Sequence, residues 1–272
     1  MTDLATQPHE STVFERPPLI TKAAARAQRR QEKAAKNQRQ SAKPLEPKNA
    51  TQADYIDILR EGDSTFAIGP AGTGKTYIAA RIAAQRLIKG DIEKIVVSRV
   101  TASKKEHAIG FLPGNIDAKM KPWMIPVLEG LRAEVSAAQL DLWRSENKFE
   151  IVPFEYMRGR TFEKCAVILD EAQNATFSDL ELLVTRTGNG TQMIIAGDHT
   201  QVDIPNSGLE TFVSIAEDED IMDVIEFSEE DVVRSPLAKK WVIALAKHKR
   251  ARQAAADTDG IVDTLPSFVH KR

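Results

Sequence analysis

The sequence predicts an α/β fold, a mostly parallel sheet with helices on both faces. Short apolar runs alternate with stretches of helix-forming residues from position 51 onward, which is the order that parallel strands and crossover helices require. A glycine-rich loop joins one expected strand to the next helix, and two adjacent carboxylates end another strand. Because open α/β sheets bind ligands at the carboxyl ends of their strands, the loop and the carboxylates should lie at one edge.

The individual elements follow from apolar runs, helix formers and breakers. The strands, read from short apolar runs, are expected at 64–68, 94–98, 149–154, 165–169 and 192–196, with a final edge strand at 222–227. The helices are expected at 53–61, entered through Thr51, and at 75–87, 123–143, 178–187 and 236–253. Glycines and prolines between 110 and 126 indicate an insertion, and the third of these helices is its later part.

Composition divides the chain into three parts. Residues 1–48 carry 10 Lys and Arg against 5 Asp and Glu and few large apolar residues, so a disordered basic arm is expected. Both a solvated tail and an arm that helps to hold nucleic acid fit this composition. Residues 49–255 are expected to form one folded domain, and residues 256–272 a flexible tail. An acidic run, 217–231, has nine acids and no base, so charge permits a nucleic-acid partner without requiring one.

The number of cysteines and the hydropathy of the chain indicate in which cellular compartment the protein is expected. The chain of 272 residues has a single cysteine, Cys165, inside an apolar run, which excludes an internal disulfide and suits a reducing compartment. No run approaches the roughly 18 apolar residues of a membrane span. A cytoplasmic protein with no membrane partner is expected.

The glycine-rich loop has the spacing of a Walker A motif. Between an expected strand and helix, its backbone N–H groups would close around the phosphates of ATP, and the helix N-terminus would favour their negative charge. The expected nucleotide-binding residues are Gly69, Pro70, Ala71, Gly72, Thr73, Gly74, Lys75 and Thr76. Lys75 would reach the β and γ phosphates as a catalytic residue, and the Thr76 hydroxyl would hold Mg²⁺.

Two further strand ends carry polar side chains. Asp170 and Glu171 follow the run 165–169, so Asp170 is expected to hold Mg²⁺ with Thr76, while Glu171 would deprotonate the water that attacks the γ-phosphate. Gln201 lies in Gly197-Asp-His-Thr-Gln201, which follows another strand, and it would sense the γ-phosphate. A turn capped by Asp198 is the simpler alternative for that segment.

The ordered set of motifs resembles the PhoH family of phosphate-starvation-inducible ATPases over about residues 49–250. The matching segments are 69–77, Gly110-Phe-Leu-Pro-Gly114, Arg158-Gly-Arg-Thr161, Asp170-Glu-Ala-Gln-Asn174, Thr185-Arg-Thr-Gly188, 197–205, Ser207-Gly-Leu209 and Asp231-Val-Val-Arg-Ser-Pro236. Val100 and Ser235 depart from the family pattern, which has proline and histidine there. The resemblance implies a cytoplasmic ATPase with a RecA-like P-loop core, similar to one half of a superfamily one helicase, and a link to RNA.

The resemblance also implies roles for residues that spacing alone does not single out. Gln52 lies upstream of the loop, where related helicases have a glutamine that reads adenine. The matched arginines are Arg99, Arg158, Arg160, Arg186 and Arg234; any of them could stabilise charge on the transferring phosphoryl group, and Arg234 is the preferred finger. The part after the arm suffices for one RecA-like core only, so a homo-oligomer, such as a hexameric ring, is expected to supply an arginine in trans.

Mg²⁺-dependent ATP hydrolysis on RNA or single-stranded nucleic acid is therefore the leading function. The alternative is a regulatory or protein-remodelling ATPase without a nucleic-acid substrate. A small-molecule kinase would not need Glu171 or Gln201, and no acceptor motif is visible. A GTPase would need a guanine motif, and Asn147-Lys-Phe-Glu150 matches one only superficially, since it has Glu for Asp and precedes a strand.

Overall fold

The computed structural model describes residues 43–100 and 121–262, which form an α/β domain with one six-stranded sheet. The strands lie in the order β3-β2-β4-β5-β1-β6, and all of their pairings are parallel. Their bounds are β1 Thr65–Ile68, β2 Lys94–Arg99, β3 Phe149–Ile151, β4 Cys165–Asp170, β5 Gln192–Gly197 and β6 Asp223–Glu226. The predicted parallel sheet is confirmed, including the edge strand β6.

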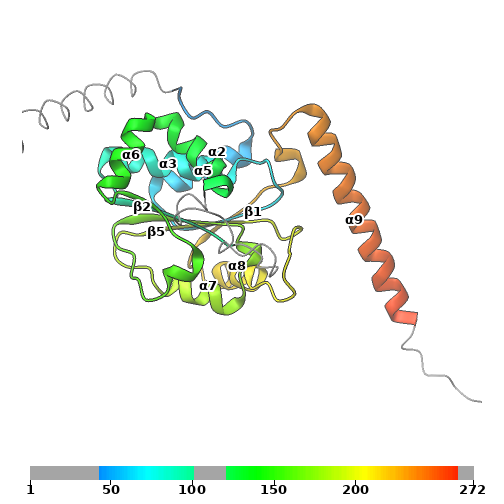
Figure 1. Cartoon of the computed structure of the whole chain (residues 1–272). Coiled ribbons are helices and arrows are strands. Elements are labelled where there is room, and N and C mark those ends of the chain that lie inside the picture. Colours follow the sequence, from blue (N-terminus) through cyan, green and yellow to red (C-terminus); the bar gives the residue numbers. More distant parts are fainter. Residues whose placement is uncertain (1–42, 101–120, 263–272) are drawn as a thin grey trace, which may run out of the picture.

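Helices cover both faces of the sheet, as predicted (Figure 1). On one face lie α2 Ala50–Glu61, α3 Lys75–Lys89, α5 Ile125–Glu134 and α6 Ala137–Ser145. On the other face lie α7 Phe177–Val184 and α8 Leu209–Asp218, and α9 Pro236–Val262 follows β6. Short 3₁₀-helices connect them at η2 Lys121–Met124, η3 Phe154–Met157, η4 Ala172–Asn174 and η5 Glu229–Asp231.

Two apolar cores hold these layers together, because alternate strand residues point to opposite faces. Ala67 and Val97 pack with α2, α3 and α5, whereas Phe66 and Val96 pack with α7 and α8. Both faces of β1, β4 and β5 are buried throughout. Burial on both faces explains why these strands are continuous apolar runs rather than alternating ones.

The register brings the functional strand ends to one edge. Ile68 of β1 pairs with Gly197 of β5, and Arg99 of β2 pairs with Asp170 of β4. Strand β5 lies between the strand that enters the glycine loop and the strand that ends in the carboxylates. The loop after β1 and the residues after β2, β4 and β5 therefore share the carboxyl edge of the sheet.

Several boundaries differ from the sequence prediction for local reasons. Helix α2 begins at Ala50 because Asn49, not Thr51, is its N-cap and accepts from the Gln52 backbone N–H. The expected helix 123–143 is η2, α5 and α6, with Ser136 capping α6 after a break. Strand β3 ends at Ile151 because Pro153 has no N–H to continue the ladder. The sequence analysis did not single out α8.

The ends of the described chain also extend the expected domain. Residues 43–48, assigned above to the arm, lie against α3: the Lys43 carbonyl accepts from Arg81 at 2.6 Å, and Leu45 packs on the apolar core. Helix α9 continues to Val262, past the expected end at 253. The rest of the arm, the Gly110–Gly114 motif and residues 263–272 lie outside the described residues.

Candidate functional site

The glycine loop forms a tight turn between β1 and α3 that requires glycine at fixed positions. Gly69, Gly72 and Gly74 have φ values of 133°, 92° and 94°, which disfavour any residue with a side chain. A Cβ atom on Gly69 would lie 2.1 Å from the Phe227 carbonyl oxygen. Residues 69–74 therefore wrap closely around the N-terminus of α3, with their backbone free to face an anion.

Lys75 is folded into this loop. Its Nζ donates to the carbonyl oxygens of Gly69 and Pro70 at 2.5 and 2.9 Å and to the Thr73 hydroxyl at 3.3 Å. Burial lowers the Lys75 pKa to about 8, although the nearby carboxylates of Asp198, Asp170 and Glu171 oppose that shift. The ammonium group therefore already lies at the place where phosphate oxygens would enter.

Thr76 and Asp170 meet although they are 94 residues apart. The Thr76 Oγ1 donates to Asp170 Oδ1 at 2.8 Å, which joins the first turn of α3 to the end of β4. Hydroxyl and carboxylate oxygens are hard donors, and Mg²⁺ in nucleotide sites takes one or two carboxylates with phosphate and water oxygens. These two residues fit that ion, and the described residues contain no cluster of three or more His, Cys, Asp or Glu suited to a protein-only metal site.

Glu171 is held in an uncommon backbone conformation directly after β4. Its φ and ψ of 57° and 39° lie in the left-handed region, which costs free energy for a residue other than glycine. Its carboxylate accepts from Arg99 Nη2 at 2.7 Å and from Gln173 Nε2 at 2.5 Å. The turn thus directs the partly exposed Glu171 carboxylate toward a cavity that Lys75 also lines.

Arg99 bridges both carboxylates. Its Nη1 lies 3.1 Å from Asp170 Oδ2 and also donates to the Trp123 carbonyl oxygen at 3.0 Å, while Nη2 binds Glu171. Sequence reasoning named Arg99 only as one of five matched arginines. The signal that could have found this contact is its position at the carboxyl end of β2, which pairs in register with Asp170.

A chain of hydrogen bonds links the ends of β4 and β5. The Asp198 backbone N–H donates to Gln173 Oε1 at 3.0 Å, and Gln201 Nε2 donates to Asp198 Oδ2 at 2.6 Å. Asp198 also accepts from the Thr200 N–H and hydroxyl, so it does cap the turn that holds Gln201. Gln173 was missed as a site residue, although it lies in the quoted Asp-Glu-Ala-Gln motif.

Arg234 lies over the glycine loop of its own chain. The Val233 N–H donates to the Gly72 carbonyl at 3.0 Å, and a Cβ atom on Gly72 would lie 2.5 Å from Arg234 Nε. Arg234 therefore lines the phosphate cavity in cis. Of the other matched arginines, Arg158 and Arg160 pair with Asp179 and Glu150, and Arg186 has a buried Nε without a hydrogen-bond partner; none of these three lines the cavity.

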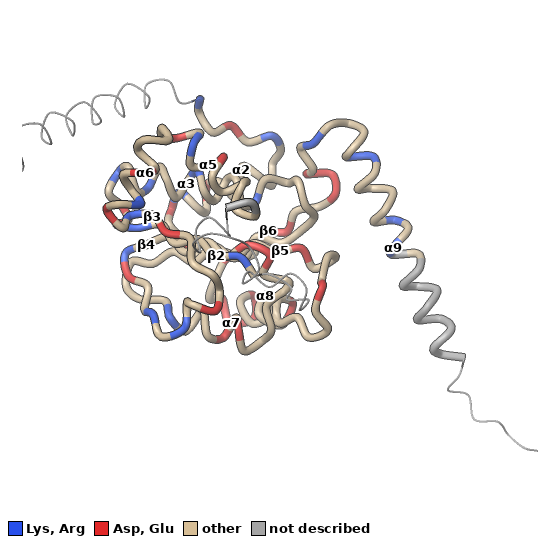
Figure 2. The backbone as a smooth tube through the Cα atoms, in the orientation of Figure 1, with Lys and Arg blue, Asp and Glu red and all other residues tan. Residues whose placement is uncertain are grey.

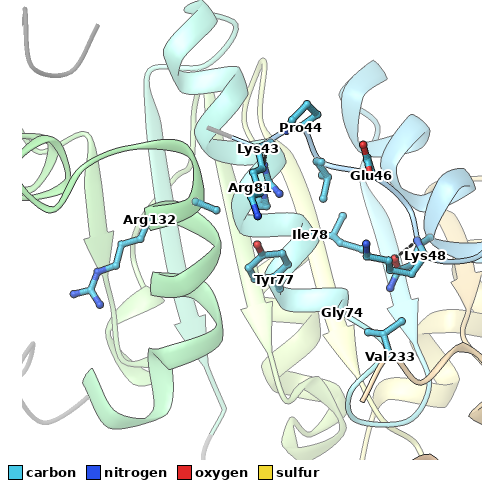
Figure 3. A pocket seen from close by; sticks show the side chains of 13 residues that line it. Lys43, Pro44, Glu46, Lys48, Gly74, Tyr77, Ile78, Arg81, Arg132 and Val233 are labelled. Atoms are coloured by element: carbon cyan, nitrogen blue, oxygen red, sulfur yellow. Dashed lines mark hydrogen bonds between the residues drawn. The ribbon is translucent and has the colours of Figure 1, made fainter. Parts of the chain in front are cut away.

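Two adjoining cavities meet at the start of α3. The first, of about 500 Å³, is lined by the loop, Lys75, both carboxylates, Gln201 and Arg234. The second, of about 680 Å³, lies between residues 43–48 and α3, where Tyr77, Ile78 and Arg81 face the segment (Figure 3). Gly74, Tyr77 and Val233 line both cavities. A ligand with its phosphates in the first cavity could thus extend into the second.

Gln52 lies between the loop and the second cavity with both ends of its amide occupied. Its Nε2 donates to the Thr73 carbonyl at 2.8 Å, and its Oε1 accepts from the Lys48 N–H at 2.8 Å. Gln52 is buried, 3% exposed. It connects the glycine loop to residues 43–48, and its amide has a second N–H and a second lone pair on Oε1 beyond these two bonds.

Comparison with known proteins identifies the family. The family model described as PhoH-like protein matches residues 44–246. The chain belongs to the PhoH family. Protein PhoH of Escherichia coli K12 is 40% identical over 206 residues, which cover 74% of this chain and 58% of that protein. The PhoH-like protein of Bacillus subtilis is 38% identical over 208 residues, which cover 75% of this chain and 65% of that protein. The chain thus spans less than two thirds of these relatives.

Two solved structures resemble this PhoH-family chain at low similarity. The Pif1 helicase of Candida albicans is 19% identical with a TM-score of 0.35, covering 68% of this chain and 40% of that one. The large terminase of a thermophilic bacteriophage is 12% identical with a TM-score of 0.44, covering 72% and 50%.

The GTPase alternative from the sequence can be tested against the geometry. The segment Asn147–Glu150 lies at the amino end of β3, where the Asn147 side chain accepts from Lys94 at 3.0 Å. It is thus at the edge of the sheet opposite the nucleotide cavity, which excludes it as a guanine motif. Among the helices described, none is long and apolar enough to cross a membrane.

Proposed function

We propose that this PhoH-family protein is a Mg²⁺-dependent ATPase that acts on RNA or single-stranded nucleic acid. The observation that carries the proposal is the hydrogen bond of 2.8 Å between Thr76 and Asp170, beside the buried Lys75 ammonium. A phosphate loop alone binds anions. A loop joined to a strand-end carboxylate, with a second carboxylate at the next residue, suits metal-assisted hydrolysis.

Each residue has a role that its position supports. Lys75 and the N–H groups of residues 71–76 bind the β and γ phosphates, and Thr76 and Asp170 hold Mg²⁺, which supplies charge stabilisation at the phosphates. Glu171 accepts the proton of the attacking water. Gln201 senses the γ-phosphate through the Asp198 turn, and Arg234 stabilises charge on the phosphoryl group from the same chain.

The second cavity is the proposed site for the ribose and base. It is continuous with the phosphate cavity through Gly74 and offers the Tyr77 ring and the Ile78 side chain as apolar walls. Gln52 supports this site by holding residues 43–48 to the loop. Direct reading of the base by Gln52, the role that the resemblance implied, would use the second N–H and the second lone pair of that amide.

Nucleic acid as the polymer substrate is supported by fewer features. The arm is basic in sequence, and Tyr156, which like Trp123 and Phe111 is an aromatic residue that could stack on a base, is 62% exposed. Trp123 instead packs on the core, and Phe111 lies outside the described residues. An assembly of several copies in the cytoplasm, such as a hexameric ring, completes the proposal; because Arg234 lines its own site, an arginine supplied in trans would have to be another one.

The deciding experiment is ATP turnover measured without polymer, with single-stranded RNA and with single-stranded DNA. Stimulation by either polymer is expected, with Glu171→Gln as the inactive control. Turnover that neither polymer changes would favour the regulatory or protein-remodelling ATPase. Absence of Mg²⁺-dependent turnover in every condition would refute the ATPase itself. Deleting residues 1–42 should weaken RNA binding and flatten its salt dependence if the arm holds the polymer.

A further inference from the structure

Helix α9 stands beside the domain rather than in one of its layers (Figure 1). Up to position 249, its polar contacts with the body come from two lysines: Lys239 Nζ lies 3.3 Å from a Glu230 carboxylate oxygen and donates to the Glu230 carbonyl oxygen, and Lys249 Nζ lies 3.4 Å from the Thr200 carbonyl oxygen. An isolated helix that is not packed on an apolar face gains little from propensity alone. The stability of α9 therefore calls for a surface that packs against it.

One face of α9 carries a row of exposed large apolar side chains. Leu237, Trp241 and Leu245 are 67%, 61% and 52% exposed. Their spacing of four residues places them along one face of the helix. Single exposed hydrophobic residues need no explanation, but a contiguous row marks an interaction site.

This apolar row has a basic border. Residues 236–249 contain four lysines and no acid, and Figure 2 shows Lys and Arg but no Asp or Glu along the described part of α9. Lys240 and Lys247 are exposed. A surface that matches α9 should therefore combine apolar residues with a negative rim.

The same chain presents such a surface at the end of α8. Ile215 and Ile221 are 39% and 65% exposed, and the intervening run 217–220 consists of four exposed acids. No Lys or Arg occurs from position 209 to 233. We define the α8 surface as Ile215, Ile221 and the acids 217–220.

We propose that the apolar row of α9 docks on the α8 surface of a second copy of this chain. The inference takes the homo-oligomer of the proposed function as its premise and names the surfaces that join the copies. Two different surfaces meet, so the contact is heterologous, and repeating it closes a ring when the rotation allows. The α8 surface of a second copy offers both apolar side chains for the row and acids for the lysines of α9, whereas nucleic acid would pair with the lysines but leave the apolar row uncovered.

The segment that precedes α9 connects the proposed contact to the nucleotide site. The residues immediately before the helix are Val233, bonded to the Gly72 carbonyl, and Arg234, which lies over Gly72. Asp231 ties the same segment to α2, since it accepts from the Thr51 hydroxyl at 3.1 Å. A neighbour that fixes α9 would therefore also fix the segment that lies on the phosphate loop.

The first test measures the mass of the full chain by light scattering at micromolar concentration. The wild-type protein should be an oligomer, and Trp241→Glu should raise the dissociation constant about 30-fold, the loss expected of a buried aromatic anchor. Tyr156→Glu is the matched control, because Tyr156 is equally exposed, at 62%, on η3; its mass should equal that of the wild type. Circular dichroism and binding of a fluorescent ATP analogue verify that each variant is folded and keeps its nucleotide site.

The second test reverses charges across the proposed contact. Lys240→Glu with Lys247→Glu, and separately Glu217→Lys with Glu219→Lys, should each weaken assembly, and the four changes together should restore it. A monomeric wild type, or an oligomer that Trp241→Glu leaves intact, would overturn the inference. So would an α9 variant, Trp241→Glu or Lys240→Glu with Lys247→Glu, that loses RNA binding at unchanged mass, because α9 would then be a nucleic-acid surface. Binding of the ATP analogue by a monomeric variant separates this outcome from failure of the proposed ATPase site.

Discussion

The two adjoining cavities, proposed to hold the phosphates and the base of a nucleotide, are built in different ways. At the phosphate end, four charged groups converge, and each one already has a partner within the protein: Lys75 binds loop carbonyls, and Asp170 and Glu171 bind Arg99. At the base end, residues 43–48 face the apolar side chains of α3. The charged groups that could take part in hydrolysis therefore lie at the phosphate end, while packing and backbone hydrogen bonds fix the shape of the base end. Substitutions should separate the two ends by the size and kind of their effects.

The largest effect is expected from Glu171→Gln. The amide is isosteric but cannot accept the proton of water, so kcat should fall about 100-fold to 10,000-fold, the usual contribution of a general base. Steady-state turnover measures this, and binding of a fluorescent ATP analogue should remain. Glu181→Gln, on the exposed side of α7, is the control. Normal turnover by the Glu171→Gln variant would show that Glu171 is not the general base.

The next effect, on binding, is expected from Lys75→Ala. Hydrogen bonds to a charged group contribute about 1.5–3 kcal/mol, so affinity for the ATP analogue should fall about 10-fold to 100-fold. Fluorescence titration measures the affinity, with Lys89→Ala at the exposed end of the same helix as the control. An affinity equal to that of the control would mean that the phosphates bind elsewhere.

Arg99→Ala tests whether the ion pairs of Arg99 with Asp170 and Glu171 weaken the binding of a divalent cation at the phosphate end. Without the guanidinium that lies 3.1 Å from Asp170 and 2.7 Å from Glu171, the carboxylates should bind a divalent cation about 10-fold more tightly in the absence of nucleotide. Electron paramagnetic resonance with Mn²⁺ reports this affinity directly. The exposed Arg60→Ala is the control. Weaker Mn²⁺ binding would instead show that Arg99 holds the carboxylates in position.

The smallest effect on nucleotide binding is expected from Gln52→Ala at the base end. The change removes two buried hydrogen bonds, worth about 1 kcal/mol each, between the loop and residues 43–48. Thermal unfolding should show a loss of about 2 kcal/mol, and ATP affinity should fall less than 10-fold. Preference for adenine over guanine should stay the same. Loss of that preference at unchanged stability would restore Gln52 as a reader of the base.

How much the sequence predicted depends on whether a feature is local. The sequence predicted that the glycine loop joins a strand to a helix and that the two carboxylates end a strand, because these elements follow one another within a few residues. The break between α5 and α6 was missed, since apolar periodicity continues across Val135 and the stop comes from the Ser136 cap. The roles assigned to Gln201 and Arg234 remain predictions.

By itself, the sequence determined the parallel sheet, the phosphate loop and the family, because these rest on short patterns whose residues are neighbours along the chain. Only the tertiary structure decided which distant groups meet. The strand order places β2 beside β4, so Arg99 reaches both carboxylates, and it places β5 between β1 and β4, so Asp198 lies next to Gln173. The exposed row on α9 is likewise visible only once packing has left it uncovered. Strand order and packing depend on contacts across the whole domain, and no local pattern encodes them.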